Sequence, residues 1–127
     1  MSGRGTEVHI LDRVVLAGDR VEPWLAEFRA RYLPGARERG MTVSRLWRSH
    51  TGRDTVAVQI LWSLPGVPSF YAMRGMTARD PRPAAFWSWT DDLAVTRERR
   101  VLEPLETWEA TELSETSEKS ETWERIV

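Results

Sequence analysis

Two neighbouring strand-like segments joined by a short loop constrain the fold of this chain most strongly. Residues 41–50 and 55–64 have strand character, and residues 51–54 (Thr-Gly-Arg-Asp) between them have the length and the glycine of a hairpin loop. Successive side chains of a strand point to opposite faces of its sheet, so the larger apolar side chains of residues 55–64 fall on one face. We predict that this face packs on the core. Its residues are Val56, Val58, Ile60 and Trp62.

A strand and a helix are predicted before the hairpin. Residues 7–16 are rich in β-branched side chains and lead into a turn at residues 17–19. Asp19 and Glu22 have the spacing of a capping box, so a helix should begin there. Apolar residues then recur at three- and four-residue steps and give this helix one apolar stripe. The stripe consists of Val21, Trp24, Leu25, Phe28, Tyr32 and Leu33.

The end of this helix has two interpretations. Pro34 and Gly35 predict a kink or an end, because proline removes a helical N–H and glycine weakens a helix. Residues 36–39 could instead continue the helix until Gly40 terminates it.

The second half of the chain predicts two helices and a last strand. Residues 69–76 can form a short helix, and residues 84–96 a longer one with Phe86, Trp89 and Leu93 along one side. The last strand is expected around residues 105–109. This element order predicts an α+β fold of the ferredoxin-like βαββαβ type, with an antiparallel sheet and helices on one face.

The face of the sheet away from the helices is expected to be partly apolar. If the larger apolar residues of 55–64 face the helices, then Ala57, Gln59 and Leu61 face the other way, beside Leu46 or Trp47. An exposed apolar patch of this kind usually marks an interface, and the same face of a second copy would cover it. We therefore predict a homodimer with two-fold symmetry.

Composition excludes several classes of protein. The chain has 127 residues, no cysteine and a net charge of −1, and no stretch is apolar enough to span a membrane. We expect no nucleic-acid partner, no membrane partner and a cytoplasmic location. Residues 1–110 are expected to form one domain, and the Ser-, Thr- and Glu-rich residues 111–127 a polar C-terminal tail. Trp123 in this tail could alternatively dock on a partner subunit or fill a cavity.

The predicted plan resembles the dimeric α+β barrel superfamily over residues 6–110. The strongest similarity lies in residues 86–93 (Phe-Trp-Ser-Trp-Thr-Asp-Asp-Leu) and residues 95–102 (Val-Thr-Arg-Glu-Arg-Arg-Val-Leu), which look like the end of NIPSNAP-type domains. The superfamily includes NIPSNAP-like proteins, antibiotic-biosynthesis monooxygenases and small polyketide cyclases. The resemblance implies a sheet-to-sheet dimer and a pocket between each sheet and its helices, but it does not settle the reaction.

Two histidines are candidate proton-transfer groups. His9 lies in the first strand on the face of Leu11 and Arg13, and it could act as a general base or be a hydrogen-bonded structural residue. His50 lies at a strand end, where an exposed turn residue is the ordinary explanation. No spacing typical of a metal site is present, so we expect none.

Arginines and other polar residues of the strands supply further candidates. Arg45 and Arg48 fall on opposite faces, and the one that faces the cavity could bind a carboxylate or stabilise an enolate. Either could instead bridge a dimer or lie at the surface. Asp12 is a further candidate base, although an aspartate next to Arg13 is more often in a surface ion pair. Gln59 could bind a ligand, but we favour a place in the dimer interface.

Aromatic residues are the candidates for substrate binding, although their spacing is also typical of an ordinary core. Trp87 and Trp89 are two residues apart on a helix, so one of them should project into a pocket mouth or an interface. Residues 65–83 are the best candidate for a mobile lid. The substrate-binding candidates are Trp24, Trp47, Trp62, Tyr71, Phe86 and Trp89.

The function that these features favour is a cofactor-independent enzyme of small-molecule, secondary metabolism. It would hold an aromatic or polyketide-like substrate in a tryptophan-lined pocket and act as a cyclase or monooxygenase, with His9 as base and Arg45 or Arg48 as oxyanion partner. No phosphate-binding loop or dinucleotide motif is present, so no organic cofactor is expected. The alternative is a non-catalytic dimeric module that binds a hydrophobic metabolite or haem.

Overall fold

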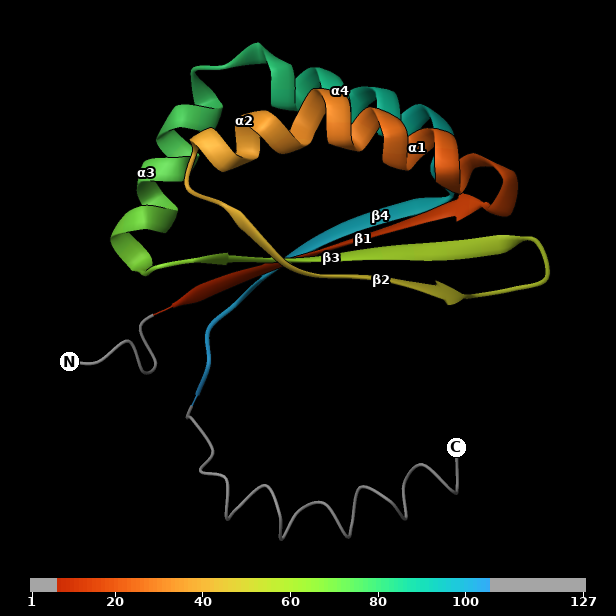
Figure 1. The fold of residues 1–127 in the computed structure, drawn as a ribbon, viewed down its shortest axis with the longest axis horizontal. Coiled ribbons are helices and arrows are strands. Elements are labelled where there is room, and N and C mark those ends of the chain that lie inside the picture. The colour runs from red at the N-terminus through yellow and green to blue at the C-terminus, as the bar shows by residue number, and fades with distance from the viewer. Residues whose placement is uncertain (1–6, 106–127) are drawn as a thin grey trace, which may run out of the picture.

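A four-stranded antiparallel sheet with strand order β2-β3-β1-β4 forms one layer of the protein (Figure 1). The computed structural model describes residues 7–105, so the predicted tail at residues 111–127 lies outside the described residues. The predicted hairpin is confirmed, with residues 51–54 between β2 and β3. The strands are β1 (Val8–Ala17), β2 (Thr42–His50), β3 (Thr55–Leu64) and β4 (Thr96–Leu102).

All helices lie on one face of the sheet and form the second layer (Figure 1). A single turn at Gly18–Arg20 leads from β1 into α1. The predicted α+β, ferredoxin-like class is confirmed, with an antiparallel sheet and helices on one face. The helices are α1 (Val21–Glu27), a π-helical segment (Phe28–Tyr32), α2 (Leu33–Glu38), α3 (Val67–Ala78) and α4 (Pro81–Leu93).

The helix that begins at α1 passes through Pro34 and ends at Gly40. Pro34 cannot donate a backbone hydrogen bond and its ring crowds the preceding turn, and the widened π-helical turn at Phe28–Tyr32 lies directly before it. The N–H of Gly40 donates to the carbonyl of Arg37 (3.0 Å), and that of Met41 donates to Ala36 (3.0 Å). Together with the φ of 88° at Gly40, these bonds form a Schellman motif. The interpretation in which Gly40 ends the helix is therefore the correct one.

The core lies between the sheet and the helices. The predicted core face of β3 is confirmed, because Val56, Val58, Ile60 and Trp62 are all buried. The same holds for the residues of β1 that face the helices. These are Val8, Ile10, Asp12, Val14 and Leu16, and Asp12 is the polar member of the set.

Two local predictions are wrong. Asp19 and Glu22 do not form a capping box, because no side chain caps α1 and the N–H of Val21 donates to the carbonyl of Gly18 in the preceding turn. The last strand is β4 rather than residues 105–109, and Leu105 lies outside any strand and is fully exposed. Charged residues on the helix-facing side of β4 conceal the alternation that would have marked it as a strand. The remaining residues of the predicted strand, 106–109, lie outside the described residues.

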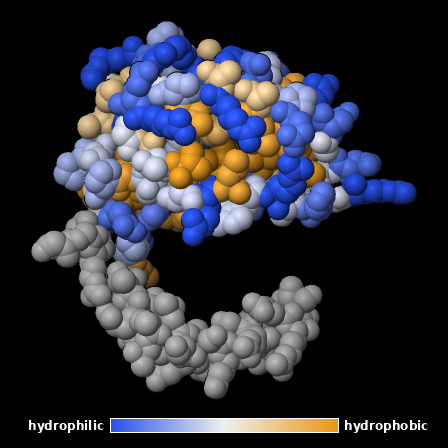
Figure 2. Space-filling model, in the orientation of Figure 1, coloured by the Kyte–Doolittle hydropathy of each residue, from blue (hydrophilic) through white to orange (hydrophobic). Residues whose placement is uncertain are grey.

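The edge of the sheet at β2 is less well covered than its centre. Figure 2 shows apolar surface between the helix layer and the sheet on this side of the molecule. Leu46 is 42% exposed here and lines a shallow depression of about 220 Å³ together with Leu25 and Val58. Leu46 therefore faces the helices, and its neighbour Trp47 faces the opposite side of the sheet, paired with Gln59.

The N-terminus of α4 gives a pH-dependent test of the fold. Asp80 accepts hydrogen bonds from the backbone N–H and the side chain of Arg82, which lower the pKa of its carboxyl from 3.8 to about 2. A lowered pKa means that the carboxylate stabilises the folded state above about pH 4, and that this contribution is lost as the pH falls through about 2. Asp80→Ala should therefore lower the urea midpoint at pH 7, and the difference from the wild type should shrink toward pH 2.

The control for this test is Asp92→Ala, since Asp92 is exposed in the last turn of the same helix. Its urea midpoint should follow that of the wild type at every pH. A difference between Asp80→Ala and wild type that stays constant from pH 7 to pH 2 would contradict the assignment.

Candidate functional site

A pocket lies between α3 and the β1–β4 side of the sheet. Its volume of about 390 Å³ is in the range of small-molecule sites. Most of its lining is apolar, but two arginines contribute to it. We call it the α3–β4 pocket, and its lining residues are Ile10, Phe70, Met73, Arg74, Thr77, Ala78, Arg99 and Val101.

The sheet side of this pocket is built on an ion pair between Asp12 and Arg99. The two residues face each other in the β1–β4 register. Nε of Arg99 donates to Oδ1 of Asp12 (2.7 Å), and Nη2 donates to Oδ2 (2.8 Å). Asp12 is completely buried, whereas the Arg99 side chain remains 30% exposed toward the pocket that it lines. A bidentate pair of this kind fixes the plane of the guanidinium as well as its position.

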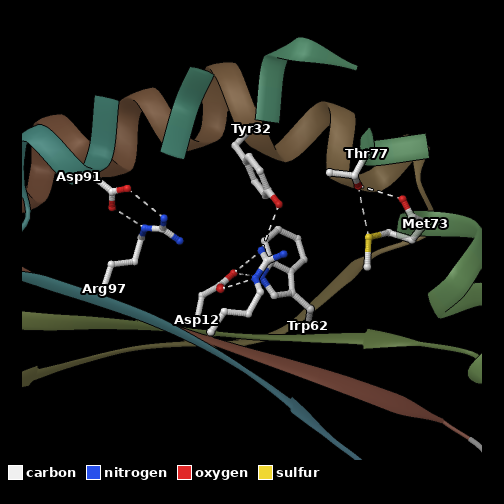
Figure 3. Close-up of polar contacts among 8 residues, drawn as sticks. Asp12, Tyr32, Trp62, Met73, Thr77, Asp91 and Arg97 are labelled. Carbon is white, nitrogen blue, oxygen red and sulfur yellow. Dashed lines mark hydrogen bonds and ion pairs between the residues drawn. The ribbon is translucent and has the colours of Figure 1, made fainter. Parts of the chain in front are cut away.

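Two buried aromatic residues complete the hydrogen bonding of this pair (Figure 3). Tyr32 reaches down from the helix layer, and its hydroxyl accepts a hydrogen bond from Nη2 of Arg99 (3.1 Å). Nε1 of Trp62 donates to Oδ2 of Asp12 (2.9 Å). Asp12 therefore accepts three hydrogen bonds, which satisfies a buried carboxylate far better than the ion pair alone would.

Arg99 is held in its charged form and keeps donors to spare. Burial by itself lowers the pKa of the Arg99 guanidinium, but the hydrogen bonds and charge of Asp12 outweigh this effect and raise the pKa above its ordinary value. The guanidinium has five N–H donors, and three of them go to Asp12 and Tyr32. No residue among 7–105 accepts a hydrogen bond from Nη1, so two donors remain on a side chain that lines the pocket.

The helix side of the pocket comes from α3. Phe70 and Met73 supply apolar surface, and the guanidinium of Arg74 lies 5.9 Å from the centre of the Phe70 ring. The hydroxyl of Thr77 donates to the carbonyl of Met73 (2.9 Å), one turn back along the helix. The proton of Thr77 is thus already engaged, and the arginines are the strongest free donors of the pocket.

The predicted base, His9, lies elsewhere in the sheet. It shares the face away from the helices with Leu11 and Arg13, as its parity predicted. Its Nε2 lies 2.9 Å from Oε1 of Glu7, and its Nδ1 lies 3.3 Å from the carbonyl oxygen of Trp62. His9 does not line the α3–β4 pocket, and its role as a general base stays a prediction.

The other polar candidates are also spread over the molecule. Arg45 and Arg48 lie on opposite faces of β2, as predicted, and both are exposed. Nη1 of Arg45 donates to the carbonyl of Ser44 (2.9 Å), and Nη2 of Arg48 forms an ion pair with Glu22 (2.7 Å). Neither arginine lines the α3–β4 pocket. Their roles stay predictions. The interpretation of Asp12 as part of a surface ion pair is wrong, because Asp12 is completely buried.

The aromatic candidates form a core more than a pocket wall. Trp24, Trp62 and Phe86 are completely buried, and Nε1 of Trp24 donates to the hydroxyl of Thr90 (2.9 Å). Trp89 packs partly buried against this cluster. None of the predicted aromatic residues lines the α3–β4 pocket, where the aromatic residue is Phe70.

The two remaining substrate-binding candidates are exposed, whereas Trp87 is half-buried. Trp47 is 47% exposed on the open sheet face, and Tyr71 is 63% exposed on α3. Trp87 contacts the ring of Tyr32 and lies under the guanidinium groups of Arg97 (4.7 Å) and Arg99 (5.5 Å). The substrate-binding roles of the predicted aromatic residues stay predictions.

Sequence reasoning missed Arg74 and Arg99. The missing signal for Arg99 was its pairing with Asp12, which appears once β4 is aligned with β1. The segment predicted as a lid, residues 65–83, contains α3, which supplies five residues of the pocket wall, and its mobility stays a prediction. Within residues 7–105 no group of three or more possible metal ligands is found, and no helix there is long and apolar enough to cross a membrane.

The buried pair gives a direct stability test. Asp12→Asn leaves the charge of Arg99 without its partner, so we expect the free energy of unfolding to fall by about 2–3 kcal/mol, less than for a fully buried pair because Arg99 is partly exposed. The matched control is Asp91→Asn. It removes the exposed carboxylate of α4 that pairs with Arg97 (2.6 Å), an arginine on the same strand as Arg99. This substitution should lower the free energy of unfolding by less than about 1 kcal/mol. Urea unfolding at equal protein concentrations measures both. Equal losses would show that the Asp12–Arg99 pair is no more important than a surface ion pair.

The sequence has no match among protein-family profiles or curated proteins, whereas solved structures share its fold. A NIPSNAP family protein from Agrobacterium tumefaciens str. C58 is 13% identical, with a TM-score of 0.62 over 84% of this chain and 94% of its own. Another from the same organism is 20% identical, with a TM-score of 0.59 over 78% and 86% of the two chains.

An enzyme is also among the similar structures. SnoaB from Streptomyces nogalater, described as a cofactor-independent oxygenase, is 20% identical, with a TM-score of 0.57 over 80% of this chain and 96% of its own. A candidate antibiotic-biosynthesis monooxygenase from Nitrosomonas europaea is 11% identical, also with a TM-score of 0.57. At these identities the likeness concerns the fold alone. The predicted resemblance is confirmed at that level, and the chain has the ferredoxin-like fold of NIPSNAP proteins and antibiotic-biosynthesis monooxygenases.

Proposed function

We propose that the protein is a small-molecule enzyme that works without an organic cofactor and acts on an aromatic or polyketide-like substrate in the α3–β4 pocket. The observation that carries this proposal is the position of Arg99, which is fixed by a buried carboxylate and a tyrosine while two of its donors stay free beside an apolar cavity. Fixed donors next to an apolar surface stabilise negative charge that develops on a substrate oxygen.

The reaction type proposed is cyclisation or oxygenation of a C–H acid. Loss of a proton from carbon to water gives an enolate, and Arg99 stabilises its oxygen. The enolate carbon can then attack a carbonyl group of the same molecule, which closes a ring with loss of water. Alternatively it reacts with O₂, so that a CH₂ group becomes a carbonyl group and one water is released, with all electrons supplied by the substrate.

A non-catalytic binding module for a hydrophobic metabolite is the second candidate. It is favoured by the lining of the pocket, which contains no histidine, aspartate or glutamate among the described residues. Such a module would bind the same class of molecules and release them unchanged.

The cysteine-free sequence of the chain suits the reducing cytoplasm, which stays our predicted location for either function.

Filling the pocket tests the proposed function. Ala78 lines the pocket and is exposed on α3, so Ala78→Phe should block the cavity without disturbing the core. The assay follows O₂ uptake and product masses for a panel of polycyclic phenols that carry an acidic CH₂ group. We expect turnover of at least one compound by the wild type, and a loss of about tenfold or more in Ala78→Phe, since a blocked pocket excludes the substrate.

The matched control is Ala72→Phe, because Ala72 is exposed on the same helix and does not line the pocket. This variant should keep wild-type turnover. His9→Ala tests the sequence-based assignment of the base, and unchanged turnover in this variant would remove it. Saturable binding in the wild type without any product would favour the binding module.

We also propose that the open face of the sheet forms a homodimer. Its inner strands carry the half-buried Leu11 and Leu61 on this side, beside Val15 and Ala57, which are already buried, and Trp47 adds exposed apolar surface at the edge. Polar groups also lie on this face, because Arg13 of β1 is paired with Gln59 of β3 and with Glu98 of β4, and these three surround a small depression with Leu11 and Arg100. A face that combines apolar surface with polar side chains able to pair across it has the composition of a protein interface.

Two adjacent residues of β2 allow a matched test of this interface. Trp47 and Leu46 are 47% and 42% exposed and lie on opposite faces of the strand. If the open face is the interface, Trp47→Glu should give a monomer in native mass spectrometry at micromolar concentration, whereas Leu46→Glu should remain dimeric, because only the first places a charge in the interface. A monomeric wild type, or a dimer that only Leu46→Glu disrupts, would rule out this arrangement.

A further inference from the structure

We propose that the α3–β4 pocket binds its small molecule as an anion, with the negatively charged oxygen facing Arg74 and Arg99. The ligand class is a flat, mainly apolar organic acid such as an aromatic carboxylate, a phenolate or a stabilised enolate. This inference rests on the function proposed above, because it names the form in which that site takes its ligand.

The charge of the pocket lining is the first argument. Arg74 and Arg99 are the charged residues of the lining, and no acidic residue is among the eight. Within residues 7–105 no carboxylate lies within ion-pairing distance of Arg74. Asp12 compensates the charge of Arg99, so Arg74 carries the charge at the pocket that no described residue compensates.

The distribution of hydrogen-bond donors is the second argument. Nη1 of Arg99 keeps two N–H donors that no described residue accepts, and Arg74 forms no side-chain hydrogen bond among residues 7–105. Thr77 has committed its proton to the carbonyl of Met73. The polar part of the pocket thus offers donors from two arginines, and an oxygen atom with negative charge is the acceptor that such groups bind best.

The absence of a base in the lining is the third argument. The described lining contains no histidine or carboxylate, and Asp12, the carboxylate paired with Arg99, is fully buried and already accepts three hydrogen bonds. A neutral acid that entered this pocket would find no side chain to take its proton. Guanidinium groups instead lower the pKa of a bound acid, so the conjugate base is the form that the pocket stabilises.

The apolar part of the pocket defines the rest of the ligand. Ile10, Phe70, Met73 and Val101 supply most of the wall, and Phe70 offers an aromatic face for stacking. A volume of about 390 Å³ accommodates a molecule with two or three fused rings. The lining therefore favours one acidic group on a flat apolar body over a compact inorganic anion.

Isothermal titration calorimetry with two isosteric probes tests this proposal. The probes are 2-naphthoate, which is ionised at pH 7, and 2-naphthamide, which has the same shape without the charge. We expect the full chain to bind 2-naphthoate roughly tenfold or more tightly than 2-naphthamide, the ratio that one charge-assisted hydrogen bond gives. Binding of 2-naphthol should also strengthen between pH 7 and pH 10, as the phenol ionises near pH 10 while the arginines stay charged.

The variants are chosen so that loss of the fold is not mistaken for loss of the site. Arg74→Gln removes an exposed charge that has no ion-pair partner among the described residues, so the fold should persist. It should lower the naphthoate-to-naphthamide ratio of affinities severalfold, and the two free donors of Arg99 should account for the preference that remains. Arg79→Gln is the matched control, because Arg79 is exposed at the end of the same helix and does not line the pocket, and it should keep the wild-type ratio.

Each other outcome overturns a defined part of the argument. Equal affinity for both probes leaves an apolar pocket, and with it the proposed function, but overturns anion binding. A preference for 2-naphthoate that is undiminished in Arg74→Gln, or that falls equally in Arg79→Gln, shows that the anion does not bind at Arg74. Failure of every probe to bind at millimolar concentration overturns both this inference and the proposed use of the pocket.

Discussion

The structure depends on the burial of one carboxylate in the middle of its sheet. Asp12 lies on β1, one of the two inner strands, among apolar neighbours that face the helices, and is completely shielded from water. Transfer of a carboxylate from water to such a place is unfavourable unless its oxygens receive hydrogen bonds. Arg99 from β4, Trp62 from β3 and, through Arg99, Tyr32 from the helix layer meet this need. One buried charge thus fixes the relative positions of three strands and the helix layer.

The same arrangement explains why the α3–β4 pocket and the open face of the sheet can serve different purposes. Alternation along β1 sends Asp12 toward the helices and its neighbours Leu11 and Arg13 toward the open face. The helix side acquires a rigid guanidinium, and the open side acquires apolar side chains mixed with polar ones such as Arg13 and Gln59. The division follows from the two-residue period of a strand, so it requires no additional structural element.

The sequence predicts the parts of the fold in which apolar pattern and local chemistry agree. Alternation along β3 identifies Val56, Val58, Ile60 and Trp62 as the core side, and Gly40 marks the end of the first helix. The pattern fails at β4, where Arg97 and Arg99 occupy positions that face the helices. Asp91 of α4 compensates the charge of Arg97, and Asp12 of β1 compensates that of Arg99. Each partner therefore belongs to a different element from the arginine. The candidate site was missed for the same reason, because a polar pair split between two strands has no local signature. Abundant tryptophan, in turn, drew the predicted pocket toward the aromatic core.

The inward arginines of β4 also have a consequence for the behaviour of the protein in a crowded solution. β4 is an edge strand, so along its outer side the backbone groups have no strand partner within the described sheet. An apolar strand from another molecule that extended the sheet here would lie beside β4, with its helix-facing side chains next to Arg97 and Arg99. It would then have to desolvate the exposed portions of these two side chains. Inward-pointing charges at a sheet edge are one of the ways in which natural proteins discourage this kind of addition. The residue that shapes the pocket therefore also helps to keep the chain from polymerising through its own sheet.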